Sequence, residues 1–338
     1  MATLEPSARA DDSNSRVVIR GAGSIGRRHA DVFARSGATV GLWPVRPESG
    51  GAGTAIPDGI ERLDDNTGPA AMAAADLVVI ATTTSRHVAD AMQALDAGAR
   101  QVLVEKPVAV DASDAARLRG HARAADVWVA APLRAHAGFR HLASLVPHIG
   151  TPVSGHVWCQ SWLPDWRPTQ NYRLSYSARR SEGGALRDLV HELDYVEQLL
   201  GKATLMGARL EYSGPLEIEA EQAATLLWST GTATVTCRLD YVTRPAARGI
   251  VLRGPSGSVE WDVNRGRVAH LGEDGRADER VFAEDLDRDR TMLTQAQAAL
   301  GLSPRSDQGT RRAAGAPATL AEGCSVLELC DQARGMSR

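Results

Sequence analysis

The segment Arg16-Val-Val-Ile-Arg-Gly-Ala-Gly-Ser-Ile-Gly26 decides the fold of the first part of this 338-residue chain. Its apolar beginning, Arg16 to Ile19, predicts a short strand, and residues Ile25 to Ser36 predict a helix that ends at Gly37. Three glycines with the spacing G-x-G-x-x-G separate these two elements. A glycine-rich turn between a strand and a helix is typical of the first unit of a parallel α/β sheet.

The same alternation of strand and helix continues to residue 131. Residues 44–70 are rich in Gly, Pro and Asp and predict loops with one short element. We predict strands at 38–43, 76–81, 101–104 and 127–131, and helices at 86–97 and 112–125. Residues 16–131 are therefore expected to form a Rossmann domain, the doubly wound fold that binds dinucleotides.

The glycine turn has the residues that a dinucleotide requires. Gly21 permits the tight turn, Gly23 lets a pyrophosphate approach the backbone, and Gly26 allows close packing of the helix on the strand. The helix that starts near Ser24 and Ile25 offers backbone amides to the phosphates. We predict that these five residues bind the cofactor.

The second strand lacks the acidic residue that an NAD-specific site places at its end to bind the ribose 2′-hydroxyl. No acid occurs between Asp31 and Glu48. Arg46 can instead pair with a 2′-phosphate, because a guanidinium matches phosphate geometry. The sequence therefore favours NADP over NAD, and an ordinary loop cation is the alternative interpretation of Arg46.

Polar residues also follow the strand at 76–81. Thr82 and Thr83 stand at the carboxyl edge of the sheet, where open α/β sheets bind ligands, so we assign them to the cofactor site. His87 begins the next helix and is interpreted as a structural or cofactor-adjacent residue.

One of only two lysines in the chain, Lys106, ends the apolar run that begins at Val102; the chain has 36 arginines. Arginine cannot replace lysine where an amine with a tunable pKa is needed, because the guanidinium stays protonated. The other lysine, Lys202, fits a plain surface cation. We predict that Lys106 takes part in proton chemistry.

Strands dominate the second part of the chain, residues 132–338. Turn-separated runs predict a mainly antiparallel sheet that is open on one face, with strands at 153–160, 204–212, 223–228, 232–239, 250–253 and 258–262. Helices are predicted at 139–148, at 184–200 and, finally, near 318–333. We expect an α+β domain that binds the substrate.

His191 lies on the helix predicted over 184–200, three residues after Asp188 and three before Asp194. This spacing places the three side chains on one helix face, and a carboxylate beside a histidine suits a general base. A zinc site of the His-Glu-x-x-His type is excluded, because Tyr195 stands where the second histidine is needed. The alternative is a polar helix face in solvent.

The bulk composition excludes several functions. A net charge of −3 gives no electrostatic reason to bind nucleic acid or an anionic membrane, and no apolar run approaches the length of a membrane span. The four cysteines lack C-x-x-C spacing, so neither zinc nor a disulfide framework is predicted, and no metal is expected. Residues 1–15 are polar, without an apolar core, and predict a disordered lead-in and a cytoplasmic protein.

Five stretches together make the chain resemble the Gfo/Idh/MocA family of NAD(P)-dependent sugar and cyclitol oxidoreductases. They are Gly21-Ala-Gly-Ser-Ile-Gly-Arg-Arg-His29, Ala81-Thr-Thr-Thr-Ser-Arg-His87, Val104-Glu-Lys-Pro-Val108, Leu133-Arg-Ala-His136 and Gly183-Gly-Ala-Leu-Arg-Asp-Leu-Val-His-Glu-Leu-Asp-Tyr195. The Glu-Lys-Pro and His-Glu-x-Asp elements are specific in combination, and the match covers most of the chain in the family's order.

The resemblance implies a Rossmann domain, a second domain with an open sheet, and a homodimer or homotetramer formed through that sheet. It also implies a cis bond between Lys106 and Pro107, and it places Lys106 and His191 beside the nicotinamide and the substrate hydroxyl. One departure is that many members have the upstream Asp four residues before the His, whereas Asp188 stands three before His191.

Aromatic and basic residues gather between Trp158 and Arg180. Trp166, Tyr172 and Tyr176 are suited to stack on a sugar or nucleoside, and Arg173 to face a phosphate or carboxylate. An arm packed on the sheet or on a neighbouring subunit is the alternative. Near the start of the second domain, Arg134 is expected to hold cofactor or substrate, whereas His136 is expected to be structural.

These observations predict a hydride transfer between a nicotinamide and a ring hydroxyl or ketone of a sugar, amino sugar, nucleotide sugar, cyclitol, nucleoside or aminoglycoside intermediate. His191 takes the hydroxyl proton and Asp194 orients it, while Lys106 stabilises the developing charge. Glu105 contacts the nicotinamide ribose or holds Lys106. The alternatives are reduction of a C=N or C=C bond on the same scaffold, and a dinucleotide-binding regulator without turnover.

Overall fold

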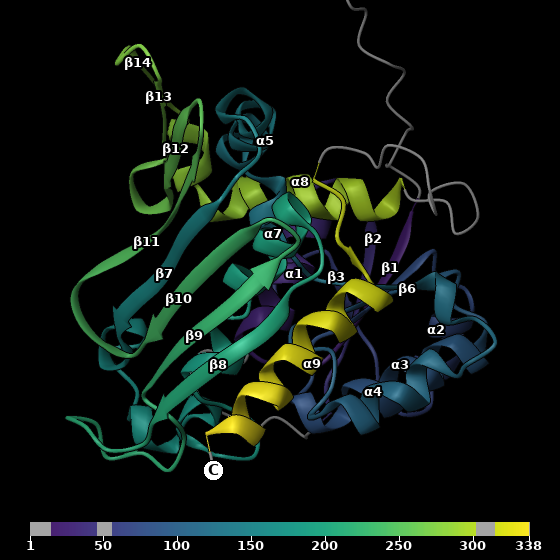
Figure 1. Cartoon of the computed structure of the whole chain (residues 1–338). Coiled ribbons are helices and arrows are strands. Elements are labelled where there is room, and N and C mark those ends of the chain that lie inside the picture. Colours follow the sequence, from purple (N-terminus) through teal and green to yellow (C-terminus); the bar gives the residue numbers. More distant parts are fainter. Residues whose placement is uncertain (1–14, 46–55, 302–314, 338) are drawn as a thin grey trace, which may run out of the picture.

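The computed structural model describes residues 15–45, 56–301 and 315–337, and it contains two β-sheets, seen at the right and left of Figure 1. Most of the predicted lead-in, and also Arg46, lie outside the described residues.

The first sheet is parallel apart from one short strand at its edge. Its order is β15-β6-β5-β4-β1-β2-β3, and only β15 runs antiparallel to its neighbour. The strands are β1 (Arg16–Arg20), β2 (Thr39–Trp43), β3 (Ile60–Arg62), β4 (Leu77–Ile80), β5 (Gln101–Val104), β6 (Val127–Val129) and β15 (Ala318–Thr319). The order reverses between β1 and β4, and ligands of such sheets bind at the carboxyl ends of the strands there.

Helices cover both faces of this sheet. On one face α1 (Ser24–Arg35) and α8 (Arg288–Leu300) pack on the strands. On the other face lie α2 (Gly68–Ala73), α3 (Thr84–Ala97), α4 (Ala112–Arg119) and α9 (Leu320–Met336). Every residue of β4 and β5 is consequently buried, which explains why β4 is entirely apolar and β5 is apolar after Gln101.

The second sheet has the order β14-β13-β12-β11-β7-β10-β9-β8. All neighbouring strands are antiparallel except β7 and β10, which are parallel. The strands are β7 (Ser154–Trp162), β8 (Thr204–Glu211), β9 (Ala223–Thr230), β10 (Ala233–Asp240), β11 (Val242–Gly254), β12 (Gly257–Asp262), β13 (Arg267–Gly272) and β14 (Ala277–Val281).

One face of the second sheet forms a core with α5 (Ala137–Leu145), α6 (Ala185–Asp188), α7 (His191–Leu200) and α9. Large aromatic side chains such as Tyr195, Trp228 and Trp261 are fully buried there. On the opposite face side chains such as Met206 and Leu227 are exposed. The predicted combination of a Rossmann domain and an open-faced sheet is therefore confirmed.

Short 3₁₀ helices connect several of these elements. They are η2 (Ala124–Asp126), η3 (Pro132–Ala135), η4 (Val146–Ile149), η5 (Leu163–Trp166), η6 (Tyr172–Leu174), η7 (Tyr176–Ala178), η8 (Val263–Arg265) and η9 (Ala283–Leu286).

The structure differs from the predicted elements in the bounds of two helices and in several elements that the sequence did not predict. The helix expected over 112–125 ends at Arg119, next to Gly120, and the helix expected over 184–200 is interrupted at Leu189, whose φ of −101° and ψ of 33° are not helical. Strands β13 and β14 and helix α8 were not predicted from the sequence. All residues of β14 are exposed, so its sequence lacks the apolar alternation that indicates a strand.

The C-terminal residues belong to the layers of both sheets. Thr319 begins α9 with a capping box, in which its side chain accepts from the Glu322 amide and the Glu322 carboxylate accepts from the Thr319 amide. Strand β15 pairs with β6 of the first sheet, while α9 also packs against β8 of the second. Residues after 315 therefore tie the two parts of the chain together (Figure 1).

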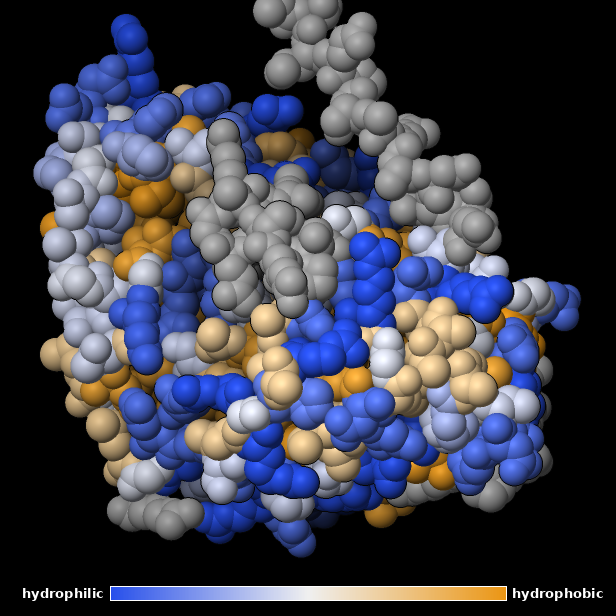
Figure 2. Space-filling view, turned by 90° about the vertical axis from the view of Figure 1, so that its right-hand side faces the viewer, coloured by the Kyte–Doolittle hydropathy of each residue, from blue (hydrophilic) through white to orange (hydrophobic). Residues whose placement is uncertain are grey.

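The surface over the first sheet is mixed in character. Figure 2 shows hydrophilic residues over most of this side, with small areas of apolar residues between them. None of the helices in the described ranges is long and apolar enough to cross a membrane.

Candidate active site

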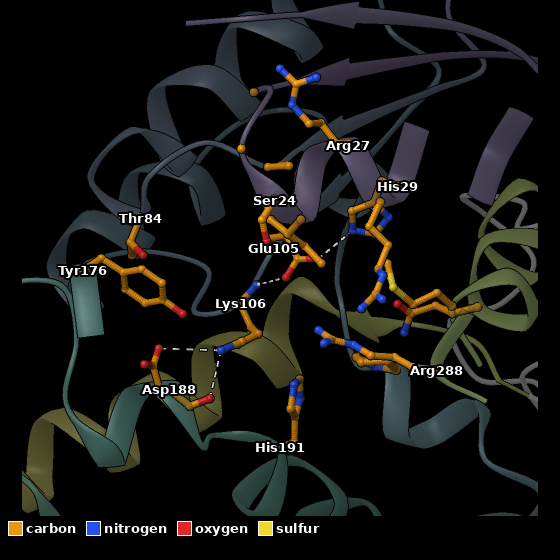
Figure 3. A pocket seen from close by; sticks show the side chains of 18 of the residues that line it. Ser24, Arg27, His29, Thr84, Glu105, Lys106, Tyr176, Asp188, His191 and Arg288 are labelled. Carbon is orange, nitrogen blue, oxygen red and sulfur yellow. Dashed lines mark hydrogen bonds and ion pairs between the residues drawn. The ribbon is translucent and has the colours of Figure 1, made fainter. Parts of the chain in front are cut away.

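A cleft of about 1490 Å³ opens at the carboxyl edge of the first sheet, between that sheet and the second part of the chain. The glycine turn and the residues after β4 and β5 form one wall; α6, α7, η5 and α8 contribute the opposite wall (Figure 3). Single-ligand sites usually measure 300–1,000 Å³, so this volume admits both a dinucleotide and a substrate.

The glycine turn has the geometry that a dinucleotide needs. Gly21 has a φ of +109°, and a Cβ atom there would lie 2.5 Å from the Ala81 carbonyl oxygen, so only glycine fits. A Cβ on Gly26 would meet the Gly21 backbone. Beside Gly23 there is no atom of the described residues within 4 Å of the corresponding position.

The first turn of α1 is available to an anion. Gly23 is its N-cap and no side chain caps the helix, so the backbone amides near Ser24 and Ile25 remain for phosphates. Both residues line the cleft together with Gly21 and Gly23. The residues present thus fit the diphosphate of a dinucleotide, with Gly26 acting through packing alone.

The residues after β4 form the floor beside the glycine turn. Thr82 and Thr83 line the cleft, and the Thr82 hydroxyl donates to Asp90 at 2.9 Å. His87 is buried, with ring nitrogens 2.8 Å from the Pro107 carbonyl oxygen and 3.2 Å from that of Thr82. Burial lowers the pKa of His87, and a neutral ring has a single N–H, which donates to one of these two carbonyl oxygens.

The cofactor preference predicted from Arg46 concerns a residue outside the described residues. Its described neighbours Pro44 and Val45 line the cleft at the end of β2.

Glu105 makes a contact that was not predicted. Its Oε1 lies 2.6 Å from Nε2 of buried His29 on α1, while its Oε2 accepts from the Lys106 amide at 3.3 Å. Burial acts to raise the pKa of Glu105, but the hydrogen bond and charge of His29 outweigh it and the pKa is lowered. His29 is the last residue of the first stretch that resembles the family. Its place in that stretch was the sequence feature that could have indicated a role for His29 in the site.

Lys106 projects into the cleft from the end of β5 (Figure 3). Its Nζ donates to the Asp188 carbonyl oxygen at 2.8 Å and lies 3.8 Å from the Asp188 carboxylate. Burial alone would lower the pKa of Lys106, but Tyr176, Asp188 and Glu105 outweigh burial and raise it. Lys106 was expected to be an amine whose pKa burial can tune downward. Its raised pKa instead makes it a charged ammonium. The bond from Lys106 to Pro107 is cis, as the resemblance implies.

Two hydroxyl groups hold the Asp188 carboxylate in place. Ser177 and Tyr241 each donate to its Oδ2 at 2.6 Å. Its Oδ1 is buried and has no hydrogen-bond partner among the described residues. This free oxygen is the carboxylate atom that lies 3.8 Å from the Lys106 Nζ, which makes Asp188 the counter-charge of the ammonium.

His191 faces the cleft from the first position of α7. Because the helix breaks at Leu189, Asp188 ends α6 and the predicted single helix face does not exist. Within the part of the chain that the structure describes, no hydrogen bond or ion pair joins His191 to another side chain. Burial, then the charges of Arg248 and Lys106, lower its pKa well below the usual value, so the ring is neutral.

The structure corrects the roles predicted for Asp194 and Arg134. Asp194 accepts two hydrogen bonds from Arg134, at 2.9 and 2.6 Å, and Arg134 also reaches Glu322 at 3.0 Å. Both residues are buried away from the main cleft. A buried guanidinium requires carboxylate partners, so Asp194 is committed to Arg134 and does not orient His191.

A second buried ion pair lies beside His191. Arg248 of β11 donates to both oxygens of Glu192, at 2.6 and 3.0 Å, and Arg248 lines the cleft. Burial raises the pKa of Glu192, while Arg248 acts in the opposite direction. Glu192, which follows His191 in the sequence, therefore positions Arg248. This arginine was not predicted as a site residue.

The aromatic segment divides into two parts. Trp166 and Tyr176 line the cleft, in agreement with their expected place near a substrate. Tyr172 and Arg173 do not: Arg173 stacks over Tyr172 at 4.7 Å and pairs with Glu217 at 3.0 Å. His136 lies at the cleft edge, 3.8 Å from Asp285, and burial lowers its pKa to about 4.

No group of three His, Cys, Asp or Glu side chains in the described ranges could hold a metal ion.

The glycine turn and its neighbours belong to a known class of nucleotide-binding domain. Residues 15–131 match the model of the oxidoreductase family with an NAD-binding Rossmann fold. Through this domain the chain is similar to the Gfo/Idh/MocA family, in agreement with the resemblance seen in the sequence.

Among curated proteins, 2,7-anhydro-N-acetylneuraminate hydratase of Escherichia coli K12 is 27% identical over 176 residues. The alignment covers 46% of this chain and 46% of that protein, so the chain matches less than half of its length.

Solved structures of similar fold cover nearly the whole chain. UDP-N-acetylglucosamine 3-dehydrogenase from Acidithiobacillus ferrooxidans is 20% identical with a TM-score of 0.75, covering 96% of this chain and 97% of its own. Levoglucosan dehydrogenase in complex with NADH is 18% identical with a TM-score of 0.77, with the same coverage. An oxidoreductase from Agrobacterium radiobacter in complex with NAD⁺, L-tartaric acid and magnesium is 21% identical with a TM-score of 0.74 and 95% coverage of both chains. These likenesses establish the two-part fold.

Proposed function

We propose that this protein is an NAD(P)-dependent oxidoreductase that transfers hydride between the nicotinamide and a ring hydroxyl or ketone of a sugar-like substrate. The observation that carries the proposal is the meeting of Lys106, Asp188 and His191 across one cleft from an open glycine turn. Two structurally similar proteins are named as dehydrogenases of UDP-N-acetylglucosamine and of levoglucosan, which supports a sugar-like substrate.

The charged Lys106 provides the electrostatic part of the chemistry. Its ammonium is directed by the Asp188 carbonyl and carboxylate and can donate a hydrogen bond to the substrate oxygen. That bond strengthens when the oxygen gains negative charge, so it favours the transition state over the ground state. When bound, the nicotinamide supplies or accepts the hydride.

The neutral His191 accepts the hydroxyl proton in the oxidising direction. Because its pKa is lowered, the ring holds this proton weakly and releases it to water in the open cleft. Ser177 and Tyr241 keep Asp188 in position, and Glu105, fixed by His29, borders the site where the nicotinamide ribose would lie.

For the cofactor we propose NADP over NAD. The end of β2 brings Pro44 and Val45 to the cleft without a carboxylate, and Arg46 follows directly in the sequence. A 2′-phosphate suits such a basic edge better than a ribose hydroxyl does.

Fluorescence titration with NADPH and NADH, on wild type and Arg46→Ala, tests the proposed function. We expect tighter binding of NADPH, and a loss of that preference in Arg46→Ala. The bound nucleotide is then used to assay sugar, cyclitol and nucleotide-sugar substrates for a change in absorbance. Failure to bind either nucleotide contradicts the proposal, whereas binding without turnover of any of these substrates supports a dinucleotide-binding regulator.

We also propose that the open face of the second sheet joins copies of this chain in a homodimer or homotetramer. Met206 is 57% exposed and Leu227 is 36% exposed on that face. Sedimentation of wild type and of Met206→Glu tests this proposal, and a monomeric wild type contradicts it.

A cytoplasmic location stays a prediction. The four cysteines are buried and unpaired, which is typical of a protein in a reducing compartment.

A further inference from the structure

Arginine side chains line the end of the cleft that the proposed reaction leaves unused. Arg28 comes from α1, Arg167 follows η5, and Arg288 begins α8. Figure 3 shows Arg288 directed into the cleft, across from Lys106 and His191. Burial, then the positive charge of Arg28, lowers the pKa of Arg288, and Arg167 acts in the same direction. Arg28 and Arg167 thus each act on the charge of Arg288, while Glu105 and Asp289 act in the opposite direction.

The charges of the cleft do not balance. Seven cationic side chains of the described residues line it against four carboxylates, although the whole chain has a net charge of −3. The carboxylates already have partners: Glu105 contacts His29, Glu182 contacts Ser85, Asp188 contacts Lys106, and Asp285 accepts from the amides of Ala137 and Gly138.

Four of the seven cations have an anionic partner, and Arg27 donates to the Ala22 carbonyl oxygen at 2.9 Å. Arg248 pairs with Glu192, Arg86 with Asp90, and Arg28 with Asp289. The side chains of Arg167 and Arg288 form no hydrogen bond or ion pair with any residue that the structure describes. An arginine pair of this kind is complementary to an anion with several oxygens.

Helix α8 adds further hydrogen-bonding groups along the same face. Arg288, Thr291 and Gln295 follow one another at spacings of three and four residues, and all three line the cleft. Gln295 is 3% exposed, and its amide nitrogen has no hydrogen-bond partner among the described residues. The Thr291 hydroxyl donates to the Asp287 carbonyl oxygen, so α8 brings two unpaired donor groups of the described residues, those of Arg288 and Gln295, to the lining of the cleft.

We propose that Arg167 and Arg288 form a subsite for a phosphoryl group of the substrate, so that the substrate is a sugar phosphate or a nucleoside diphosphate sugar. The inference rests on the proposed function for the identity of the substrate, and it deepens that function. The cofactor's own diphosphate has the glycine turn and the first turn of α1. Arg167 and Arg288 come from other elements, in the second part of the chain, and α8 packs against α1.

Calorimetric titration with inorganic phosphate and with inorganic pyrophosphate tests the subsite. The protein is first saturated with NADPH, so that the glycine turn is blocked, and acetate at equal ionic strength serves as the reference anion. We expect the wild type to bind pyrophosphate or phosphate more tightly than acetate. Arg288→Gln and Arg167→Gln should each weaken this binding about tenfold, the loss typical of one charge-assisted contact.

Arg290→Gln is the matched control. Arg290 lies on the same helix, is exposed and does not line the cleft, so this variant should bind the probes like the wild type. Stronger binding of pyrophosphate than of phosphate indicates a diphosphate substrate, and the reverse order indicates a monophosphate. In all variants the affinity for NADPH should stay within about twofold of wild type.

Three results would overturn the subsite. They are the absence of phosphate and pyrophosphate binding to the wild type, equal binding by Arg288→Gln and wild type, and a loss of NADPH affinity in Arg288→Gln. The last result would assign the arginines to the cofactor. If no dinucleotide binds but pyrophosphate binding still requires Arg288, the proposed oxidoreductase function fails and the anion subsite stands.

Discussion

The two walls of the cleft are built in different ways. On the nucleotide wall, Gly21, Gly23 and the first turn of α1 lie within a few residues of one another, and local backbone geometry creates the site. Across the cleft, Lys106 meets Asp188 over 82 residues of sequence, and on the opposite wall Asp188 meets Tyr241 over 53. A local motif can be recognised from residue spacing, whereas a site made of distant pairs depends on how the sheets pack.

The comparison also separates two carboxylates that look alike in the sequence. Asp188 and Asp194 stand at equal distances from His191 in the chain. In the structure Asp188 serves the cleft ammonium, and Asp194 serves a buried guanidinium outside the main cleft. Four substitutions test this division of roles.

The largest effect is expected for Lys106→Ala. Removing the ammonium that stabilises charge on the substrate oxygen should lower kcat/KM on the order of 10³-fold. NADPH affinity, measured by fluorescence, should change little, since the glycine turn is intact. Lys202→Ala, the other lysine of the chain, is the matched control and should behave as wild type. Retention of turnover in Lys106→Ala would contradict the assigned site.

Asp194→Asn should act on stability. It leaves the buried Arg134 without its bidentate partner, and breaking a buried pair from one side costs about 3–5 kcal/mol. Denaturant unfolding measures this loss, with the exposed Asp58→Asn as control. The folded fraction should keep kcat/KM within about threefold. A stable but inactive variant would restore the role of Asp194 beside His191.

Asp188→Asn should change the pH dependence of the reaction. Asp188 is one of the groups that raise the pKa of Lys106, so its neutralisation lowers that pKa. Activity that requires the ammonium is lost as pH rises through this pKa, so the alkaline fall in kcat/KM should move to lower pH in the variant. At neutral pH we expect a loss of about 10–100-fold. An unchanged alkaline limb would exclude Asp188 as the counter-charge.

The smallest effect is expected for Gly23→Ala on the nucleotide wall. The position has a φ of −70° and room for a Cβ atom, so the free energy of unfolding should change by less than about 1 kcal/mol. The added methyl group stands where a diphosphate approaches, and NADPH affinity should fall about tenfold. Equal affinity in wild type and variant would place the cofactor elsewhere.

Much of the first domain could be predicted, because its strands are continuously apolar and its turns contain glycine. Strand β5 was predicted with its observed ends, and the floor residues Thr82 and Thr83 lie in the cleft as expected. Helix α8 was missed because its apolar stripe is weak, yet it supplies Arg288 and Gln295 to the cleft. The contact between His29 and Glu105 joins residues 76 positions apart, which spacing alone does not reveal.

By itself the sequence determined the Rossmann domain, the open-faced sheet, the glycine turn and the two residues Lys106 and His191. These features follow from local rules: hydrophobic period, backbone freedom of glycine, and residue types that only certain chemistry requires. Only the tertiary structure decided which partner each charged group has. A break at Leu189 turned Asp188 toward Lys106, and burial committed Asp194 to Arg134, because a charge removed from water must find its counter-charge wherever the packed chain provides one.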